Sequence, residues 1–157
     1  MKHVSIVGFF VFLSLIVVSV VLAQQGPKSD GKVEYYKNPK PMPLPFSEAV
    51  RVGNTLYLSG EIGVDNKTHK LVEGGIKAEA KQVMENIKAT LERNGSSMDQ
   101  VVKCTVMIVD MKEWSAFNEV YVTYFKKDRF PARSAFGSNG LAFGAKVEVE
   151  CLATVDK

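Results

Sequence analysis

Residues 145–155, Ala-Lys-Val-Glu-Val-Glu-Cys-Leu-Ala-Thr-Val, decide the fold class of this 157-residue chain. Small or apolar residues stand at every second position, and mostly charged residues stand between them. A period of two is typical of a β-strand that buries one face and exposes the other. The segment therefore predicts a half-buried strand whose inner face carries Ala145, Val147, Val149, Cys151 and Ala153.

A hairpin and a short strand are predicted nearer the N-terminus. Residues 49–60 form two β-rich runs joined by Gly53-Asn54, a pair that tolerates the positive φ of a tight hairpin turn. Residues 33–36 indicate a short edge strand. Residues 38–45 hold four prolines, which exclude a helix and a central strand, so we expect an extended arm on the surface.

A helix and a second long strand follow the hairpin. Residues 76–94 carry apolar side chains at helical spacing, and Asn94-Gly95 supplies a helix stop, since glycine readily adopts the left-handed conformation. Residues 101–109 are almost all apolar and rich in β-branched side chains. That composition suits a central strand.

A second helix is predicted after this strand. Asp110 and Glu113 have the spacing of a capping box, and Pro131 separates the helix from the last segments. Aromatic residues repeat at helical spacing on one face of it, at Trp114, Phe117, Tyr121 and Tyr124.

The predicted order of elements is a hairpin, a helix, a strand, a second helix and one or two final strands. Two helices can cover only one face of such a sheet. The opposite face needs another cover, and a second copy of the chain is the simplest one. We therefore predict a single α+β domain with a mixed sheet, two helices on one face, and self-association.

The N-terminus has the pattern of an export signal. Residues 1–23 begin with a basic residue, continue with an apolar run over residues 4–22, and end in Val-Leu-Ala, which predicts a secretory signal cleaved after Ala23. The alternative is a retained membrane anchor, because the apolar run could span a bilayer. Residues 24–32 indicate a flexible tether, and residues 33–157 form the predicted domain. We expect an exported protein, periplasmic or secreted, with no membrane contact once the signal is removed.

The composition excludes several classes of protein. With 46% hydrophobic and 24% charged residues, the chain is an ordinary globular sequence rather than a disordered or low-complexity one. It has 20 Lys+Arg and 17 Asp+Glu, a formal net charge of +3. Such a weak charge gives no electrostatic reason to bind nucleic acid.

The two cysteines leave two alternatives open. Cys104 and Cys151 each lie in a strand-like run, where a free cysteine behaves as a small buried hydrophobic residue. In an oxidising compartment the same pair could form a disulfide. Of these we expect two free, buried thiols. Asn66 and Asn94 begin sequons for N-glycosylation, which matter only in a host that glycosylates secreted proteins.

The residues that commonly carry catalysis are few. After the predicted signal the chain keeps one histidine, His69, in a Lys-Thr-His-Lys loop, so a Ser-His-Asp triad or a histidine metal site has little support. Arg133 follows a rigid proline at the start of a strand and can grip a carboxylate through two hydrogen bonds. Glu148 stands mid-strand on the polar face. By spacing alone, both residues are more typical of solvated surface side chains than of a catalytic site.

Several runs taken together, in order and spacing, resemble the RidA (YjgF-type) family of reactive-intermediate deaminases. They are Pro-Phe-Ser-Glu-Ala-Val at 45–50, Gly-Asn-Thr-Leu-Tyr-Leu-Ser-Gly-Glu-Ile-Gly at 53–63, Gln-Val-Met-Glu-Asn-Ile-Lys at 82–88, Val-Val-Lys-Cys-Thr-Val at 101–106, Phe-Asn-Glu-Val-Tyr at 117–121, Pro-Ala-Arg-Ser at 131–134 and Val-Glu-Val-Glu at 147–150.

This resemblance implies a chorismate-mutase-like fold that forms a homotrimer, with three pockets at the subunit interfaces. It also implies hydrolysis of 2-imino or enamine acids to 2-oxo acids and ammonia, without a cofactor or a metal. The partners it implies are small 2-imino or enamine acids and further copies of the chain.

The resemblance also implies roles for individual residues. Arg133 is expected to hold the substrate carboxylate, with help from the backbone N–H near Ala135. Glu148 is expected to act as the general base that orients water toward the imine carbon. Ser59 and Asn118 match positions that line the pocket. We expect Arg133 and Glu148, on two different strands, to converge on one small cleft.

Three departures from the family pattern leave a second function open. Phe46, a predicted pocket residue, stands where the family commonly has tyrosine, and Ala135 stands where it commonly has cysteine. Residues 136–145 differ from the usual apolar strand and turn. With the export signal, these differences support an alternative, a non-catalytic trimeric module that binds small carboxylates or a protein partner in the same clefts.

Overall fold

The alternating segment forms strand β7 (Val147–Thr154), which lies inside the sheet between β3 (Thr55–Leu58) and β5 (Val101–Ile108). The computed structural model describes residues 31–38 and 44–156 of the chain. Along β7 every second side chain is buried, as the period of two predicts. Each buried side chain lies opposite another buried residue on β5, so one face of both strands belongs to the core.

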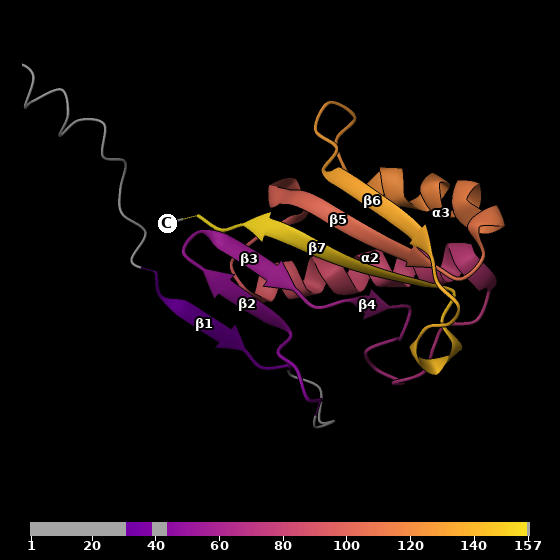
Figure 1. Cartoon of the computed structure of the whole chain (residues 1–157), viewed down its shortest axis with the longest axis horizontal. Coiled ribbons are helices and arrows are strands. Elements are labelled where there is room, and N and C mark those ends of the chain that lie inside the picture. The colour runs from indigo at the N-terminus through magenta and orange to yellow at the C-terminus, as the bar shows by residue number, and fades with distance from the viewer. Residues whose placement is uncertain (1–30, 39–43, 157) are drawn as a thin grey trace, which may run out of the picture. The chain divides into compact units, whose positions relative to one another are not determined.

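The sheet is mixed and has the order β1-β2-β3-β7-β5-β6, with β4 also paired to β7 (Figure 1). All pairs are antiparallel except β5 and β6, which run parallel. The remaining strands are β1 (Val33–Tyr36), β2 (Ala49–Val52), β4 (Glu61–Ile62) and β6 (Ala132–Gly137). Short 3-10 helices are Met98–Gln100, Met111–Glu113, Val122–Tyr124 and Ala142–Gly144.

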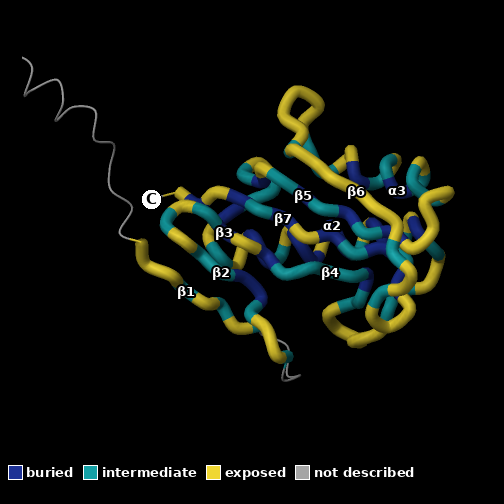
Figure 2. The backbone as a smooth tube through the Cα atoms, in the orientation of Figure 1, coloured by how far each residue is buried: buried dark blue, intermediate teal, exposed yellow. Residues whose placement is uncertain are grey.

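Helices α2 (Gly75–Arg93) and α3 (Trp114–Tyr121) lie on the same side of the sheet, behind it in Figure 1. Their apolar stripes bury one sheet face. The core between helices and sheet is continuous, and Figure 2 shows it as the dark segments of α2, β5 and β7. Its largest fully buried side chains include Phe117, Leu56, Met84, Ile87, Leu91 and Ile108. The predicted α+β fold, with two helices on one face of a mixed sheet, is confirmed.

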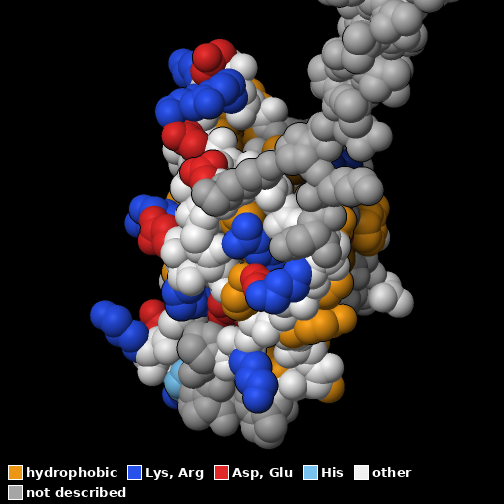
Figure 3. Space-filling view, turned by 90° about the vertical axis from the view of Figure 1, so that its left-hand side faces the viewer, with side chains coloured by type: hydrophobic (Ala, Val, Ile, Leu, Met, Phe, Trp, Pro, Cys, Tyr) orange, Lys and Arg blue, Asp and Glu red, His pale blue; other side chains and the backbone are white. Residues whose placement is uncertain are grey.

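The opposite face of the sheet has no helix over it among the described residues. Strand pairing places large apolar side chains on this open face, and several are 40–71% exposed. In the side view of Figure 3, apolar side chains line the right-hand edge, which is the side turned toward the viewer in Figure 1. The exposed members are Val33, Tyr35, Val52, Tyr57 and Phe136. The uncovered face is confirmed, and the homotrimer stays a prediction.

Most predicted element boundaries hold within a residue or two. Gly53 has φ 58° at the hairpin turn, and Asn94 ends α2 with its N–H bonded to backbone carbonyls. The capping box is met only in part: the Asp110 side chain accepts a hydrogen bond from the Lys112 N–H and so caps the 3-10 helix, whereas the Glu113 carboxylate accepts from Lys146 Nζ. Asp110 begins a 3-10 turn, and α3 starts only after that turn.

Cys104 and Cys151 form a disulfide, which corrects our expectation of two free thiols. They are directly opposite each other on the antiparallel strands β5 and β7, with Cα atoms 4.2 Å apart. Both side chains are buried on the helix-covered face. The register of the two strands, which composition alone does not reveal, brings the sulfur atoms together.

Three predictions fall wholly or mainly outside the described residues. The signal or anchor at residues 1–23 lies there, as do residues 24–30 of the tether and residues 39–43 of the proline-rich arm. Within the described ranges, no helix is both long and apolar enough to cross a membrane.

Candidate active site

Arg133 extends from the edge strand β6 toward helix α3. It lies beside Cys104 in the register of β6 and β5, so it shares the helix-covered face of the sheet. Its guanidinium carbon is 4.6 Å from the ring centre of Trp114 and 4.5 Å from that of Tyr121. One Nη1–H donates to Oδ1 of Asn118 over 2.8 Å. The cation is thus held by two aromatic rings and one neutral amide.

No carboxylate lies within ion-pair distance of Arg133 in the part of the chain that the structure describes. The side chain is also exposed to solvent. Stacking on aromatic rings stabilises a cation without neutralising it. Arg133 therefore keeps its full charge and most of its five N–H donors for an anion from outside.

Tyr121 is an uncharged side chain that lies beside the Arg133 guanidinium. Burial raises the pKa of its phenol to about 12, and the positive charge of Arg133 offsets part of that effect. Its hydroxyl oxygen is buried and has no hydrogen-bond partner among the described residues. The ring therefore contacts Arg133 as an uncharged phenol and not as a counter-ion.

Glu148 points to the other face of the sheet. It stands between the buried residues Val147 and Val149 on β7, opposite Met107 on β5 and Ile62 on β4. Gly60 approaches it closely, since a methyl group added there would lie 2.0 Å from the carboxylate oxygen Oε1. The Glu148 carboxylate thus lies on the open face, between apolar side chains and the backbone of Gly60.

The environment of Glu148 favours its protonated form. Partial burial raises the pKa of its carboxyl above the ordinary 4.5, and the negative charge of Glu150 adds to the shift. A carboxylate with a raised pKa is a stronger base, which suits proton abstraction from water. An open hollow of about 460 Å³, whose lining includes Glu150 but not Glu148, is lined by Tyr57, Leu58, Lys103, Thr105, Glu150, Cys151 and Leu152.

Ser59 and the segment before β2 lie next to Gly60. The Ser59 hydroxyl donates to the Ser47 carbonyl oxygen over 2.7 Å, and the Ser59 N–H donates to the Glu48 carbonyl oxygen over 3.0 Å. These bonds tie Ser59 to the segment that follows Phe46, a residue that is 52% exposed. Ser59 directly precedes Gly60, the residue that approaches Glu148.

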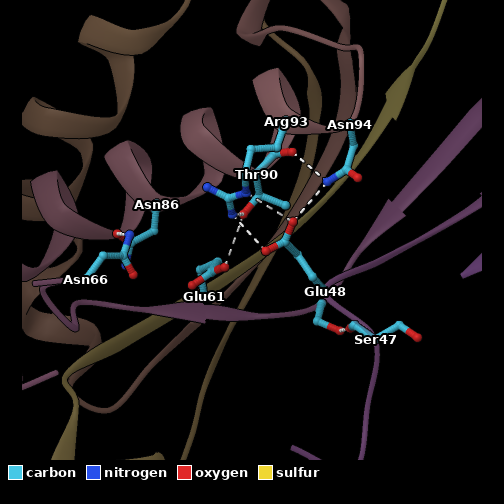
Figure 4. A network of polar contacts seen from close by, with 9 residues as sticks. Ser47, Glu48, Glu61, Asn66, Asn86, Thr90, Arg93 and Asn94 are labelled. Atoms are coloured by element: carbon cyan, nitrogen blue, oxygen red, sulfur yellow. Dashed lines mark hydrogen bonds and ion pairs between the residues drawn. The ribbon is translucent and has the colours of Figure 1, made fainter. Parts of the chain in front are cut away.

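A polar network on the other side of this segment fixes its position (Figure 4). The buried carboxylate of Glu48 accepts a hydrogen bond of 2.7 Å from Arg93 and one of 3.0 Å from the Asn94 amide. Arg93 also donates to Thr90 over 3.1 Å. The end of α2 thereby anchors the chain that leads to Ser59. The sequon residue Asn94 uses its amide nitrogen in this network.

Replacing Arg93 by leucine is expected to lower the free energy of unfolding by about 2 kcal/mol, because a buried carboxylate loses its charged partner. Urea titration followed by circular dichroism measures the change. Lys88→Leu, on an exposed position of the same helix, is the control and should change little. Equal stability of the two variants would show that Glu48 does not depend on Arg93.

We expected Arg133 and Glu148 to converge on one cleft, and within a single chain they do not; a cleft between copies of the chain stays a prediction. Adjacent residues of a strand point to opposite faces, and the register places Arg133 on the helix-covered face and Glu148 on the open one. Asn118 and Ala135 share the side of Arg133. One chain therefore presents two separate half-sites rather than a complete site.

Three residues near the half-sites were missed by the sequence analysis. Trp114 and Tyr121 were expected only as a core stripe, yet with Asn118 they form the i, i+4, i+7 row that faces Arg133. Gly60 was read as part of a motif without a role of its own. No group of histidine, cysteine or acidic side chains in the described ranges could hold a metal ion.

Comparisons with known proteins cover the same part of the chain. Residues 37–155 match the family model described as endoribonuclease L-PSP. Over 109 residues, 69% of this chain and 80% of the relative, the sequence is 41% identical to the 2-iminobutanoate/2-iminopropanoate deaminase of Mus musculus. A RutC family protein of Pyrococcus horikoshii is 43% identical over 115 residues, 73% of this chain and 90% of that protein.

Solved structures agree with the sequence comparisons. The structure of RidA from the Antarctic bacterium Psychrobacter sp. matches with a TM-score of 0.72 at 40% identity, covering 78% of this chain and 99% of that one. The yeast protein Mmf1 matches with a TM-score of 0.73 at 33% identity, covering 80% of this chain and all of that one. The similarity thus includes the sheet and both helices that carry the half-sites.

Proposed function

Because this chain belongs to the RidA (YjgF-type) family, we propose that it hydrolyses reactive 2-imino or enamine acids to 2-oxo acids and ammonia. Relatives at about 41% identity bear the name 2-iminobutanoate/2-iminopropanoate deaminase. The observation that carries the proposal is the unpaired cation of Arg133, held by Trp114, Tyr121 and Asn118 without a carboxylate. Such a cation fits the carboxylate that every 2-imino acid carries.

The proposed reaction needs a held substrate and an activated water. Arg133 binds the carboxylate and so fixes the position of C2. Glu148 accepts a proton from water as the oxygen attacks C2, and the proton passes to the imine nitrogen. The hydroxyl proton of the tetrahedral intermediate then passes to the amine nitrogen as the C–N bond breaks, which releases ammonia and leaves a 2-oxo acid. An imine carbon is already electrophilic, so orientation and a weak base suffice.

The complete site is proposed to form between two copies of the chain. Because Arg133 and Glu148 face opposite sides of the sheet, Arg133 of one copy must meet Glu148 of another. The open face, with its exposed apolar side chains, supports contact with a second copy. A closed ring of three copies, the predicted homotrimer, gives three identical sites of this kind.

The test is replacement of Arg133 by lysine. We expect kcat/KM for a freshly generated 2-imino acid to fall by about 100-fold or more, since lysine cannot form two parallel hydrogen bonds to a carboxylate. The assay generates the imine with an amino acid oxidase and traps what is not hydrolysed with semicarbazide. Arg129→Lys is the control, because Arg129 is exposed and makes only a 3.8 Å ion pair with Asp99.

The same assay separates catalysis from binding alone. Ammonia release by the wild-type protein and its loss in Arg133→Lys support a deaminase. Thermal stabilisation by small carboxylates without ammonia release would instead identify the non-catalytic binding module.

The pH dependence of the reaction tests the role of Glu148. A general base works only when deprotonated, so kcat/KM should fall as the pH decreases through the raised pKa of Glu148. Glu150→Gln removes a nearby negative charge, which lowers that pKa and moves the acidic limb of the profile to lower pH. Glu92→Gln, on the exposed surface of α2, should leave the limb in place. If the acidic limb kept its position in Glu150→Gln, the group that titrates there would be one other than Glu148.

A further inference from the structure

We propose that Trp114 and Tyr121 are positioning residues that hold the Arg133 guanidinium so that it receives a planar carboxylate along its edge. This inference deepens the proposed function, because it concerns how the same half-site recognises its ligand. Because Trp114 is the only tryptophan of the chain, its fluorescence should also change when a carboxylate binds to Arg133.

The spacing on α3 explains how two rings reach one cation. Trp114 and Tyr121 are seven residues apart, which is two helical turns, and Asn118 lies one turn from Trp114 on the same stripe. Arg133 enters from β6 at the level of Asn118, so its guanidinium lies between the rings, 4.6 Å and 4.5 Å from their centres. A short helix thereby presents two aromatic contacts and one acceptor to a single side chain.

The rings themselves are fixed by packing. Trp114 stacks on Phe117 with ring centres 5.7 Å apart, and Phe117 contacts Tyr121 at 5.6 Å. Tyr121 in turn contacts Phe125 at 4.9 Å. Phe117 is fully buried and Tyr121 is 3% exposed, so this row of rings belongs to the core. The arginine is held by a rigid part of the protein although the side chain is itself exposed.

This arrangement selects the shape of the ligand. The centres of two aromatic rings lie within 4.6 Å of the guanidinium carbon, and Asn118 takes one Nη1–H. The free N–H groups lie in the guanidinium plane, where two of them can meet the two oxygens of a carboxylate. A carboxylate is planar and fits such an approach, whereas a neutral amide of the same acid offers only one acceptor oxygen and no charge.

The experiment titrates the purified protein with 2-oxobutanoate, a stable 2-oxo acid, and follows the emission of Trp114. We expect a saturable change in emission that the neutral 2-oxobutanamide does not produce and that Arg133→Lys weakens or removes. Tyr121→Leu should raise the dissociation constant about tenfold, while Tyr121→Phe, which keeps the ring, should stay within about twofold of wild type.

Turnover measurements extend the test to Trp114 itself. Trp114→Leu should raise KM about fivefold to tenfold with a smaller change in kcat, and Trp114→Phe should restore most of the loss. Circular dichroism confirms that each variant is folded. If the rings had only a structural role, Trp114→Leu would lower the amount of folded protein, but KM would not change more than kcat. Trp114→Phe would then not restore KM.

The outcomes separate this inference from the proposed reaction. If the carboxylate changes Trp114 emission and the ring variants weaken it, the inference stands even where no ammonia is released. If the protein releases ammonia but Tyr121→Leu and Trp114→Leu both bind and turn over like wild type, the inference is overturned and the deaminase remains.

Discussion

Arg133→Lys and Glu148→Gln, each inactive alone, are expected to regain about a quarter of the wild-type activity per site when mixed in equal amounts and reassembled. The reason is the orientation of the two side chains, which face opposite sides of the sheet in every copy. A site made from two copies is intact when one copy supplies a normal arginine and its neighbour a normal glutamate. In a random ring, that combination occurs at one site in four.

The experiment needs exchange of subunits and a matched control. The two variants are unfolded together in urea, refolded, and assayed beside mixtures that were never unfolded. As the control, Arg133→Lys is refolded with a double variant, Arg133→Lys/Glu148→Gln, and this mixture must stay inactive because no copy carries a normal arginine. Absence of recovery in the refolded mixture of the two single variants would mean that both side chains act within one copy, against the geometry described above.

Gly60→Ala is expected to lower kcat by about 100-fold or more while leaving the fold intact, because the new methyl group would displace Glu148, the proposed general base. The added carbon would lie 2.0 Å from Oε1 of Glu148 and 2.9 Å from its carboxyl carbon. Gly60 does not have a φ in the left-handed region, so alanine brings no backbone strain that would obscure the result. The carboxylate is the flexible end of a side chain, and it is the group that must move.

Gly137→Ala is the matched control for Gly60→Ala. Gly137 lies at the end of β6, and its added carbon would lie 3.4 Å from Met111 and 4.0 Å from the Ile108 carbonyl oxygen, which are ordinary contact distances. Steady-state kinetics on both variants, with circular dichroism to verify folding, makes the comparison. If Gly60→Ala were as active as Gly137→Ala, the position of the Glu148 carboxylate would not matter for turnover.

The fold was predictable because its signals are local. The alternation that ends in β7, the Gly53-Asn54 turn and the stripe on α2 each depend on neighbours in the sequence. Strand β4 was not foreseen, since two residues give no period to detect. The disulfide was not foreseen either, because the strand register that places Cys104 opposite Cys151 is a long-range property.

For the candidate site, the sequence supplied candidate residues, which stay a prediction, but not their arrangement. Resemblance identified Arg133 and Glu148, while the face to which each points depends on how β5 pairs with both β6 and β7. Trp114 and Tyr121 were visible as aromatic residues at helical spacing, yet nothing in α3 itself reveals that an arginine from a later strand lies between them. Contacts of this kind exist only after the chain has folded.

The bond between Cys104 and Cys151 closes a covalent ring that contains both Arg133 and Glu148, with a sequence separation of 47 residues. Closing a ring of that size restricts the unfolded chain by about 4 kcal/mol in the loop-entropy description. A protease that cut the exposed turn near Phe143 would nick the ring without releasing a fragment. Outside a cell, where thiols oxidise and proteases abound, such a molecule would keep both reactive groups on one connected piece.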